Sequence, residues 1–580
     1  MNTNCQGCKK EFEIEDEDLK FYEKIMVPTP TFCPKCRLAR KLVWRNERSL
    51  YKRECDLCKK NIISMYKADA TFPVYCHECW WSDKWNPLDY GRTYDFSVPF
   101  FEQFKKLSEK VPRACSYETK NADCSYCNYC THSRGCYLLF GSWFDENCGY
   151  GQTVLESKEC WDCLFVKKCE LCYSSTDLVQ CTQVHFSKNC SNCMDSMFLY
   201  DCRNCQNCLF SWNLRNKSYY IFNQQVSKEK FDEFKKEILT SPDTLEKNWK
   251  EFKKAMAEKA IHKYMNGERN SGVSGELIYG SKNVKSSYYI HDGENEKYAQ
   301  RGGVGQKDSM DVFGVHSGEL IYECNSVDFS SRCLFGSNAE NNTNVSYAVD
   351  CEHINNGFGC IGLRKKEYCI LNKQYDETTY KELVEKIIDQ MDTLPFYDNR
   401  NRVYKYGEFF PHELSPHAYN ESIAQEWVPL EKEEALRLGY RWDDPEEKTY
   451  EATKRWQDLP KIDEADESIL SEIIPCQSWE EDKEKAQNHK CTKAFRITQN
   501  ELTFHKRFGI PLPRKCPNTR YFELSLLRSK PEFWQRKCMC DKKEHSAHNN
   551  SECPNKFETA YASNRVEKVY CETCYNQEIY

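Results

Sequence analysis

Residues 160–172 read Cys-Trp-Asp-Cys-Leu-Phe-Val-Lys-Lys-Cys-Glu-Leu-Cys, and this stretch decides how the middle of the 580-residue chain folds. Its cysteines belong to a series with a period of 21, as from Cys160 to Cys181 to Cys202, in which steps of 9 and 12 alternate. Short β-like pieces and turn-forming Asn, Ser and Asp residues fill the intervals. This repeat predicts the coils of a parallel β-helix, in which repeated cysteines stack into an internal ladder of small buried thiols.

The same cysteines allow a second interpretation, because several of them form close pairs that could bind metal. These groups are Cys160/Cys163, Cys169/Cys172, Cys190/Cys193 and Cys202/Cys205/Cys208. We favour the ladder, since single residues recur as stacking requires and few of the pairs are separated by the gaps typical of zinc fingers.

A second repeat domain follows the first. Residues 213–223, which close the first repeat, have a close copy at 362–372, and an amphipathic helical pattern follows each, with Ser227 or Asp376 as its N-cap. We therefore expect a duplicated solenoid whose two halves are each closed by a helix. The second half is poorer in cysteine, which weakens a metal role for the ladder.

The N-terminal block contains two pairs of Cys-x2-Cys motifs. The two quartets are Cys5, Cys8, Cys33 and Cys36, and then Cys55, Cys58, Cys76 and Cys79. Two such pairs, one to three dozen residues apart, typically form a tetrahedral thiolate site that suits Zn²⁺. The helix-compatible run that begins at Arg37 would place Cys33 and Cys36 at a helix N-terminus, as in a treble clef.

The C-terminus repeats this block at a fixed offset of 483, with losses. Asn488 and Thr519 stand where the offset would place Cys5 and Cys36, which leaves Cys491 and Cys516 with His489 as a weak substitute, so we expect this first C-terminal site to be empty. The second C-terminal site keeps five thiols for four positions. We predict Cys540, Cys553, Cys571 and Cys574 as ligands, with Cys538 as the spare, and about three zinc ions per chain.

Two resemblances support this interpretation. The pattern Cys5-x2-Cys8-x3-Phe12, Phe21-Tyr22, Pro30, Cys33-x2-Cys36-Arg37 and Arg40 resembles the bacterial "probable zinc-ribbon" treble-clef family, whose role is unsettled. The order of modules along nearly the whole chain resembles large zinc-ribbon proteins of ultra-small candidate-phylum bacteria. The resemblance implies zinc-binding modules at the termini, but it does not indicate any particular activity.

The expected fold is mainly β with small α+β zinc modules: a duplicated parallel β-helix-like solenoid flanked by treble-clef or zinc-ribbon domains. The expected order is an N-terminal double zinc module (1–112), a Cys-rich repeat (113–226), a helical connector or cap (227–268), a second repeat (269–375), a capping helix (376–392), an acidic linker (393–484) and a partly degenerate C-terminal zinc module (485–580).

Composition predicts a cytoplasmic protein without a membrane segment. Mean hydropathy is −0.81, and the sequence has no long apolar run. The N-terminus lacks the basic and apolar regions of a signal peptide. The cysteine count of 37 is odd, which fits disulfide pairing poorly, and a reducing cytosol favours metal ligands or buried thiols.

For function, we expect a non-catalytic zinc-binding scaffold whose favoured partner is RNA, DNA or a ribonucleoprotein. The candidate nucleic-acid-binding residues are Arg37, Arg40, Lys41, Trp44, Arg45, Arg48, Lys52 and Arg53. A helix face in solvent, or one docked on the acidic linker, is the competing interpretation of this segment. The alternatives for the whole chain are a protein–protein scaffold, a β-helix enzyme acting on a polymer, and thiol or metal storage. No catalytic motif stands out, so we name no catalytic residue.

Overall fold

The computed structural model describes residues 1–302, 305–314, 319–444, 449–542, 545, 548 and 551–580, so part of the predicted linker, 445–448, lies outside the described residues. The described chain is rich in strands, has a smaller share of helix and contains several groups of cysteines. None of its described helices is long and apolar enough to span a membrane.

A first stack of parallel strands occupies residues 113–226. Asn128 lies opposite Phe140, and Phe140 lies opposite Gln152, so neighbouring strands are offset by 12 positions in sequence. Only the last strand is antiparallel to its neighbour. The strands are β7 (Glu118–Thr119), β8 (Asn128–Thr131), β9 (Phe140–Trp143), β10 (Gln152–Leu155), β11 (Leu164–Lys167), β12 (Thr176–Val179), β13 (Thr182–His185), β14 (Met194–Tyr200), β15 (Gln206–Trp212), β16 (Ser218–Ile221) and β17 (Gln224–Gln225).

This offset corrects the predicted stacking unit of 21. Every third residue of the stack points inward, as Cys127, Cys130 and Cys136 do, so spacings of 9, 12 and 21 are all multiples of one three-residue step. The residue before each inward position has a positive φ, for example 55° at Tyr126 and 52° at Tyr129. A non-glycine residue rarely adopts this conformation, and here the regular hydrogen bonds between neighbouring turns hold it in place.

A second stack, residues 267–375, follows the same plan with a mostly aliphatic interior. Ser287 lies opposite Gly275 with the same offset as in the first stack, whereas the offset from Glu294 to its partner Lys307 is one position longer. Its strands are β19 (Gly267–Glu268), β20 (Gly275–Tyr279), β21 (Lys282–Lys285), β22 (Ser287–His291), β23 (Glu294–Lys297), β24 (Gln300–Gly302), β25 (Lys307–Met310), β26 (Ile321–Tyr322), β27 (Asn325–Asp328), β28 (Ser331–Cys333), β29 (Gly336–Glu340), β30 (Thr343–Ser346), β31 (Ala348–Val349), β32 (Asn355–Phe358), β33 (Glu367–Ile370) and β34 (Lys373–Gln374).

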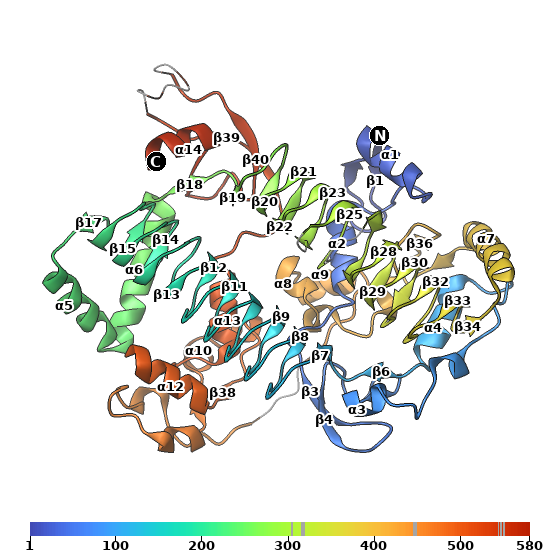
Figure 1. Cartoon of the computed structure of the whole chain (residues 1–580), viewed down its shortest axis with the longest axis horizontal. Coiled ribbons are helices and arrows are strands. Elements are labelled where there is room, and N and C mark those ends of the chain that lie inside the picture. Colours follow the sequence, from blue (N-terminus) through green and yellow to red (C-terminus); the bar gives the residue numbers. More distant parts are fainter. Residues whose placement is uncertain (303–304, 315–318, 445–448, 543–544, 546–547, 549–550) are drawn as a thin grey trace.

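The two stacks lie side by side near the middle of the molecule and carry helices at their outer ends. The rings of Phe165 and Tyr289 pack against each other across the junction, with 4.6 Å between their centroids. Helices α5 (Lys228–Leu239) and α7 (Glu377–Thr393) lie at opposite ends (Figure 1), and α5 leads into α6 (Pro242–Lys259). Ser227 and Asp376 cap α5 and α7 as the sequence predicts, each accepting a hydrogen bond from a first-turn amide.

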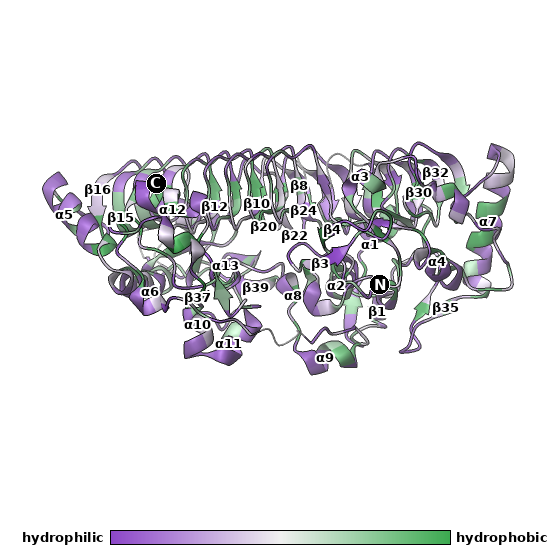
Figure 2. Cartoon of the chain, turned by 90° about the horizontal axis from the view of Figure 1, so that it is seen from below, coloured by the Kyte–Doolittle hydropathy of each residue, from purple (hydrophilic) through white to green (hydrophobic). Residues whose placement is uncertain are grey.

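The remaining segments pack along the stacks, and most of the helices lie beneath the row of strands in Figure 2. The N-terminal block has β1 (Asn2–Asn4), β2 (Glu11–Glu13), α1 (Asp16–Lys24), α2 (Pro34–Leu42), β3 (Tyr51–Glu54), β4 (Asn61–Ser64), β5 (Val74–Tyr75), α3 (His77–Trp80), η1 (Pro87–Tyr90), α4 (Phe100–Ser108) and β6 (Arg113–Ala114). The segment after α7 has β35 (Phe396–Tyr397), β36 (Val403–Tyr404), η2 (His412–Leu414), η3 (Tyr419–Glu421), α8 (Ala424–Trp427), α9 (Lys432–Arg437), η4 (Trp456–Asp458) and η5 (Glu467–Ser471). The C-terminal block has β37 (Ile474–Pro475), α10 (Gln477–Glu481), α11 (Lys483–Asn488), β38 (Ala494–Phe495), α12 (Gln499–Phe508), α13 (Pro517–Ser525), β39 (Trp534–Lys537), β40 (Lys556–Thr559), β41 (Lys568–Tyr570) and α14 (Glu572–Ile579), and it pairs with β18 (Ile261–Lys263).

Candidate metal centres

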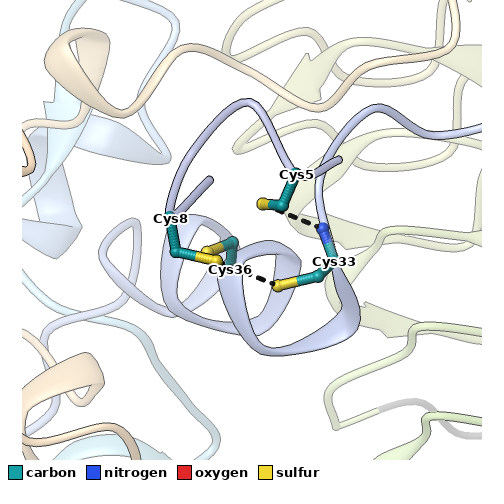
Figure 3. Close-up of side chains that lie close together, drawn as sticks. All are labelled: Cys5, Cys8, Cys33 and Cys36. Carbon is teal, nitrogen blue, oxygen red and sulfur yellow. Dashed lines mark hydrogen bonds between the residues drawn. The ribbon is translucent and has the colours of Figure 1, made fainter. Parts of the chain in front are cut away.

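The first predicted quartet comes together at the N-terminus of α2. Cys5 and Cys8 lie on the turn after β1, Cys33 caps α2, and Cys36 lies in its first turn (Figure 3). The Sγ atoms of Cys8 and Cys33 are 3.8 Å apart, which matches the edge of about 3.8 Å that a tetrahedron with Zn–S bonds of about 2.3 Å would have. The Cys33 amide donates a hydrogen bond of 3.2 Å to Cys5 Sγ. Four sulfurs in this arrangement can close the coordination shell of one metal ion.

The second quartet repeats this geometry at α3. The Sγ atoms of Cys58 and Cys76 are 3.7 Å apart, and the Cys76 amide donates to Cys55 Sγ at 3.2 Å. Cys79 completes the group. Helix N-termini and backbone amides favour negative charge, so both quartets are suited to thiolates. Hydrogen bonds from the thiols of Cys33 and Cys36 lower the pKa of Cys5 below its ordinary value.

The third quartet contains Cys538 in place of the predicted Cys540. Cys538, Cys553, Cys571 and Cys574 form the four-sulfur group, with 3.9 Å between the Sγ atoms of Cys553 and Cys571. The Cys571 amide donates to Cys538 Sγ at 3.1 Å, as the equivalent amides do in the other two quartets. The sequence offers two neighbouring cysteines for this position, and the structure places Cys538 in the quartet while Cys540 lies in a separate group with Cys574 and two histidines.

A fourth group was missed in sequence. Cys476, Cys491 and Cys516 gather at the N-terminus of α13, and the Cys516 amide donates to Cys476 Sγ at 3.2 Å. Cys476 therefore takes the role of Cys5, although the fixed offset points to Asn488 instead. The two positions differ because α10 and α11 are inserted directly after Cys476.

The fourth position of this group is held by a hydroxyl. Thr519 is fully buried, and its Oγ1 lies 3.3 Å from Cys516 Sγ, where Cys36 stands in the first quartet. The predicted substitute, His489, stacks on Phe522 instead. Three thiolates and a hydroxyl form a weaker metal site than a cysteine quartet does.

The cysteines of the stacks form no comparable group among the described residues. They lie in the interior, and their thiols donate to backbone carbonyls, as Cys160 does to Cys169 at 3.4 Å. Burial raises the pKa of Cys148 and Cys190 well above the usual range, which keeps these thiols protonated. This arrangement supports a ladder of buried thiols.

The predicted nucleic-acid-binding segment lies mostly inside the molecule. Arg37 forms an ion pair with Asp311 at 2.8 Å, and Arg40 binds Glu323 and Glu408, each at 2.7 Å. The competing interpretation, docking on the segment after α7, is correct for the Glu408 contact. The basic residues were misassigned because their acidic partners belong to the second stack and to the segment after α7, which are remote in sequence.

The other members of the segment are also held by internal contacts. Arg45 binds Glu47 at 2.6 Å, and Trp44 packs on the ring of Phe410 with 4.7 Å between the ring centroids. Of the eight predicted residues, Lys41 and Arg53 are buried and Arg48 is half-buried, which leaves Lys52 as the one exposed side chain among these described positions.

No protein-family model matches the chain, and no curated protein sequence matches it significantly. The family resemblance therefore stays a prediction. Fold and sites define the class: a strand-rich protein whose buried cysteine groups have the geometry to bind metal ions.

Proposed function

We propose that this protein is a non-catalytic, zinc-dependent scaffold in which metal modules join two β-helix-like solenoids into one rigid body. All-cysteine quartets suit Zn²⁺, and a closed quartet leaves no open coordination position for a substrate. In the first stack, the offset of 12 positions between neighbouring parallel strands and the inward residue at every third position support the β-helix assignment.

The observation that carries the proposal is that the metal modules lie at the joints of the molecule. Strand β5, which ends beside Cys76, pairs with β6 at the start of the first stack. Strand β41, which ends beside Cys571, pairs with β18 where the chain enters the second stack. Helix α2, which carries Cys36, is fixed to the second stack by Arg37 and to the segment after α7 by Arg40. Metal in each quartet would therefore stabilise contacts between distant parts of the chain.

Catalysis on a polymer is less well supported. A hollow of about 100 Å³ between the stacks is lined by Glu118, Glu340 and Glu352 together with Trp80 and Trp81. Pockets that hold a drug-sized molecule enclose about 300–1,000 Å³, and this hollow is smaller than that range.

The favoured partner is a protein. On the exposed edge of the first stack, Arg134, Glu146, Lys158 and Glu170 lie in register, and Lys158 pairs with Glu146 at 3.2 Å. Nucleic-acid-binding surfaces are predominantly positive, whereas the charges along this edge alternate in sign, which favours a protein as the partner.

Limited proteolysis tests the scaffold. Stripping metal from the full chain with a chelator under reducing conditions should expose cleavage sites near residues 112 and 265, at the joints, while far-UV circular dichroism of the stacks changes little. An unchanged cleavage pattern in verified metal-free protein would refute the proposal.

The partner class is tested separately by fluorescence anisotropy with single-stranded RNA at rising salt. We expect no tight binding. Affinity that falls steeply with salt would restore nucleic acid as the partner.

A further inference from the structure

Beside the third quartet, a second set of ligand-type atoms converges on the same sulfur. Cys540, His545, His548 and Cys574 are all buried, and their Sγ and ring nitrogen atoms lie within 4.8 Å of one another. Cys574 also belongs to the quartet with Cys538, so one sulfur is common to both groups.

His545 is oriented as a metal ligand. Its Nε2 donates to Glu578 Oε1 at 2.8 Å, which leaves the Nδ1 lone pair directed to the cluster. Nδ1 lies 3.3 Å from Cys540 Sγ, close to the edge of about 3.6 Å expected for tetrahedral Zn with one S and one N ligand. A carboxylate that fixes the ring of a metal-binding histidine is a common outer-shell arrangement.

His548 provides an independent observation. Its Nδ1 donates to the Ser551 carbonyl oxygen at 2.6 Å, so Nε2 carries the free lone pair. That Nε2 is buried and has no hydrogen-bond partner among the described residues, and His548 as a whole is only 6% exposed. A buried nitrogen without a partner is unfavourable unless something binds it.

We propose that Cys540, His545, His548 and Cys574 bind a second metal ion of the zinc type, and that the Cys574 thiolate bridges it to the ion of the quartet. The bridge accounts for the fifth thiol, which a single tetrahedral site leaves unused. It also improves the charge balance: a Zn²⁺ with four thiolates carries −2, whereas two Zn²⁺ with five thiolates and two neutral imidazoles carry −1.

Metal content of full-length variants tests the proposal. Elemental mass spectrometry should find one zinc fewer per chain in His548→Ala and in Cys540→Ser, and two fewer in Cys574→Ser. His353→Ala, which changes a half-exposed histidine on the second stack, is the matched control and should keep the wild-type count. Wild-type metal content in both His548→Ala and Cys540→Ser would overturn the proposal.

A measurement on the unmutated chain covers the case in which a variant fails to fold. With Co²⁺ in place of zinc, exchange through the bridging sulfur should lower the EPR signal per cobalt once both sites fill. An EPR signal that stays proportional to cobalt up to saturation would contradict the bridge.

A variant that keeps all the ligands gives a further test. Glu578→Gln should release the second ion faster to a chelator.

Discussion

Replacing Arg40 by methionine removes the cation between two buried carboxylates while keeping the length of the side chain. Arg40 Nη2 binds both oxygens of Glu323 at 2.7 and 2.8 Å, and Nη1 binds Glu408 at 2.7 Å. Burial already raises the pKa of Glu323 to about 7, against the attraction of Arg40. Without the arginine, carboxylates must stay charged and unpaired or take up protons.

The magnitude follows from the loss of this cation. Removing one partner of a buried ion pair typically costs about 3–5 kcal/mol, because it leaves an uncompensated buried charge. Since about 1.4 kcal/mol is a factor of ten, local opening of α2 should become about a thousandfold more frequent.

Hydrogen exchange followed by mass spectrometry measures this opening directly in α2 (Pro34–Leu42). Arg437→Met, at an exposed arginine that pairs with Glu434, is the control and should leave exchange unchanged. Adding Glu323→Gln and Glu408→Gln to Arg40→Met should restore much of the protection. Exchange in α2 of Arg40→Met within threefold of wild type would refute the reasoning.

Three further predictions concern the cysteines and one buried histidine. Cys190→Ala should destabilise the first stack by about 1 kcal/mol in thermal unfolding and leave the zinc content unchanged, whereas a loss of zinc would place metal in the ladder. Contrary to the expectation from sequence, the trio of Cys476, Cys491 and Cys516 should bind one ion more weakly than the quartets do, so Cys476→Ser should remove the ion that a mild chelator strips first; an unchanged release profile would show that this trio is empty. His417→Phe tests acid sensitivity, because burial lowers the pKa of His417 to about 3 and its ring stacks on Tyr66. The unfolded chain takes up the proton near pH 6.5, so the wild type should lose about 2 kcal/mol relative to the variant between pH 7 and pH 5, and parallel pH profiles of stability would contradict this.

The metal quartets were predictable because their signal is local. A Cys-x2-Cys turn fixes the geometry of each pair of ligands. A cysteine followed by proline, as at Cys33, also indicates that a helix begins there, which places the pair at a helix N-terminus. The choice between Cys538 and Cys540 was not local, since it depends on an amide contributed by Cys571. Cys476 was missed because a fixed offset cannot allow for the inserted helices.

The stack was recognised as a repeat, but its step was not. Cysteine fills only some inward positions, and Ser133, Ser157 and Ser187 fill others, so the spacing of cysteines alone conceals the three-residue step. The basic segment was misassigned for a different reason. A basic residue such as Arg40 is expected to be solvent-exposed when only the sequence is known, because its buried acidic partner in the second stack, Glu323, is remote in sequence.

Metal content of the wild-type chain tests the central claim most directly. After a mild chelator and gel filtration, elemental mass spectrometry should find four zinc ions per chain: three from the cysteine quartets and one from the bridged site that contains Cys540, His545 and His548. A count of three would leave the quartets intact and refute only the bridged site. Fewer than three ions, or iron in place of zinc, would contradict the account of a zinc-joined scaffold.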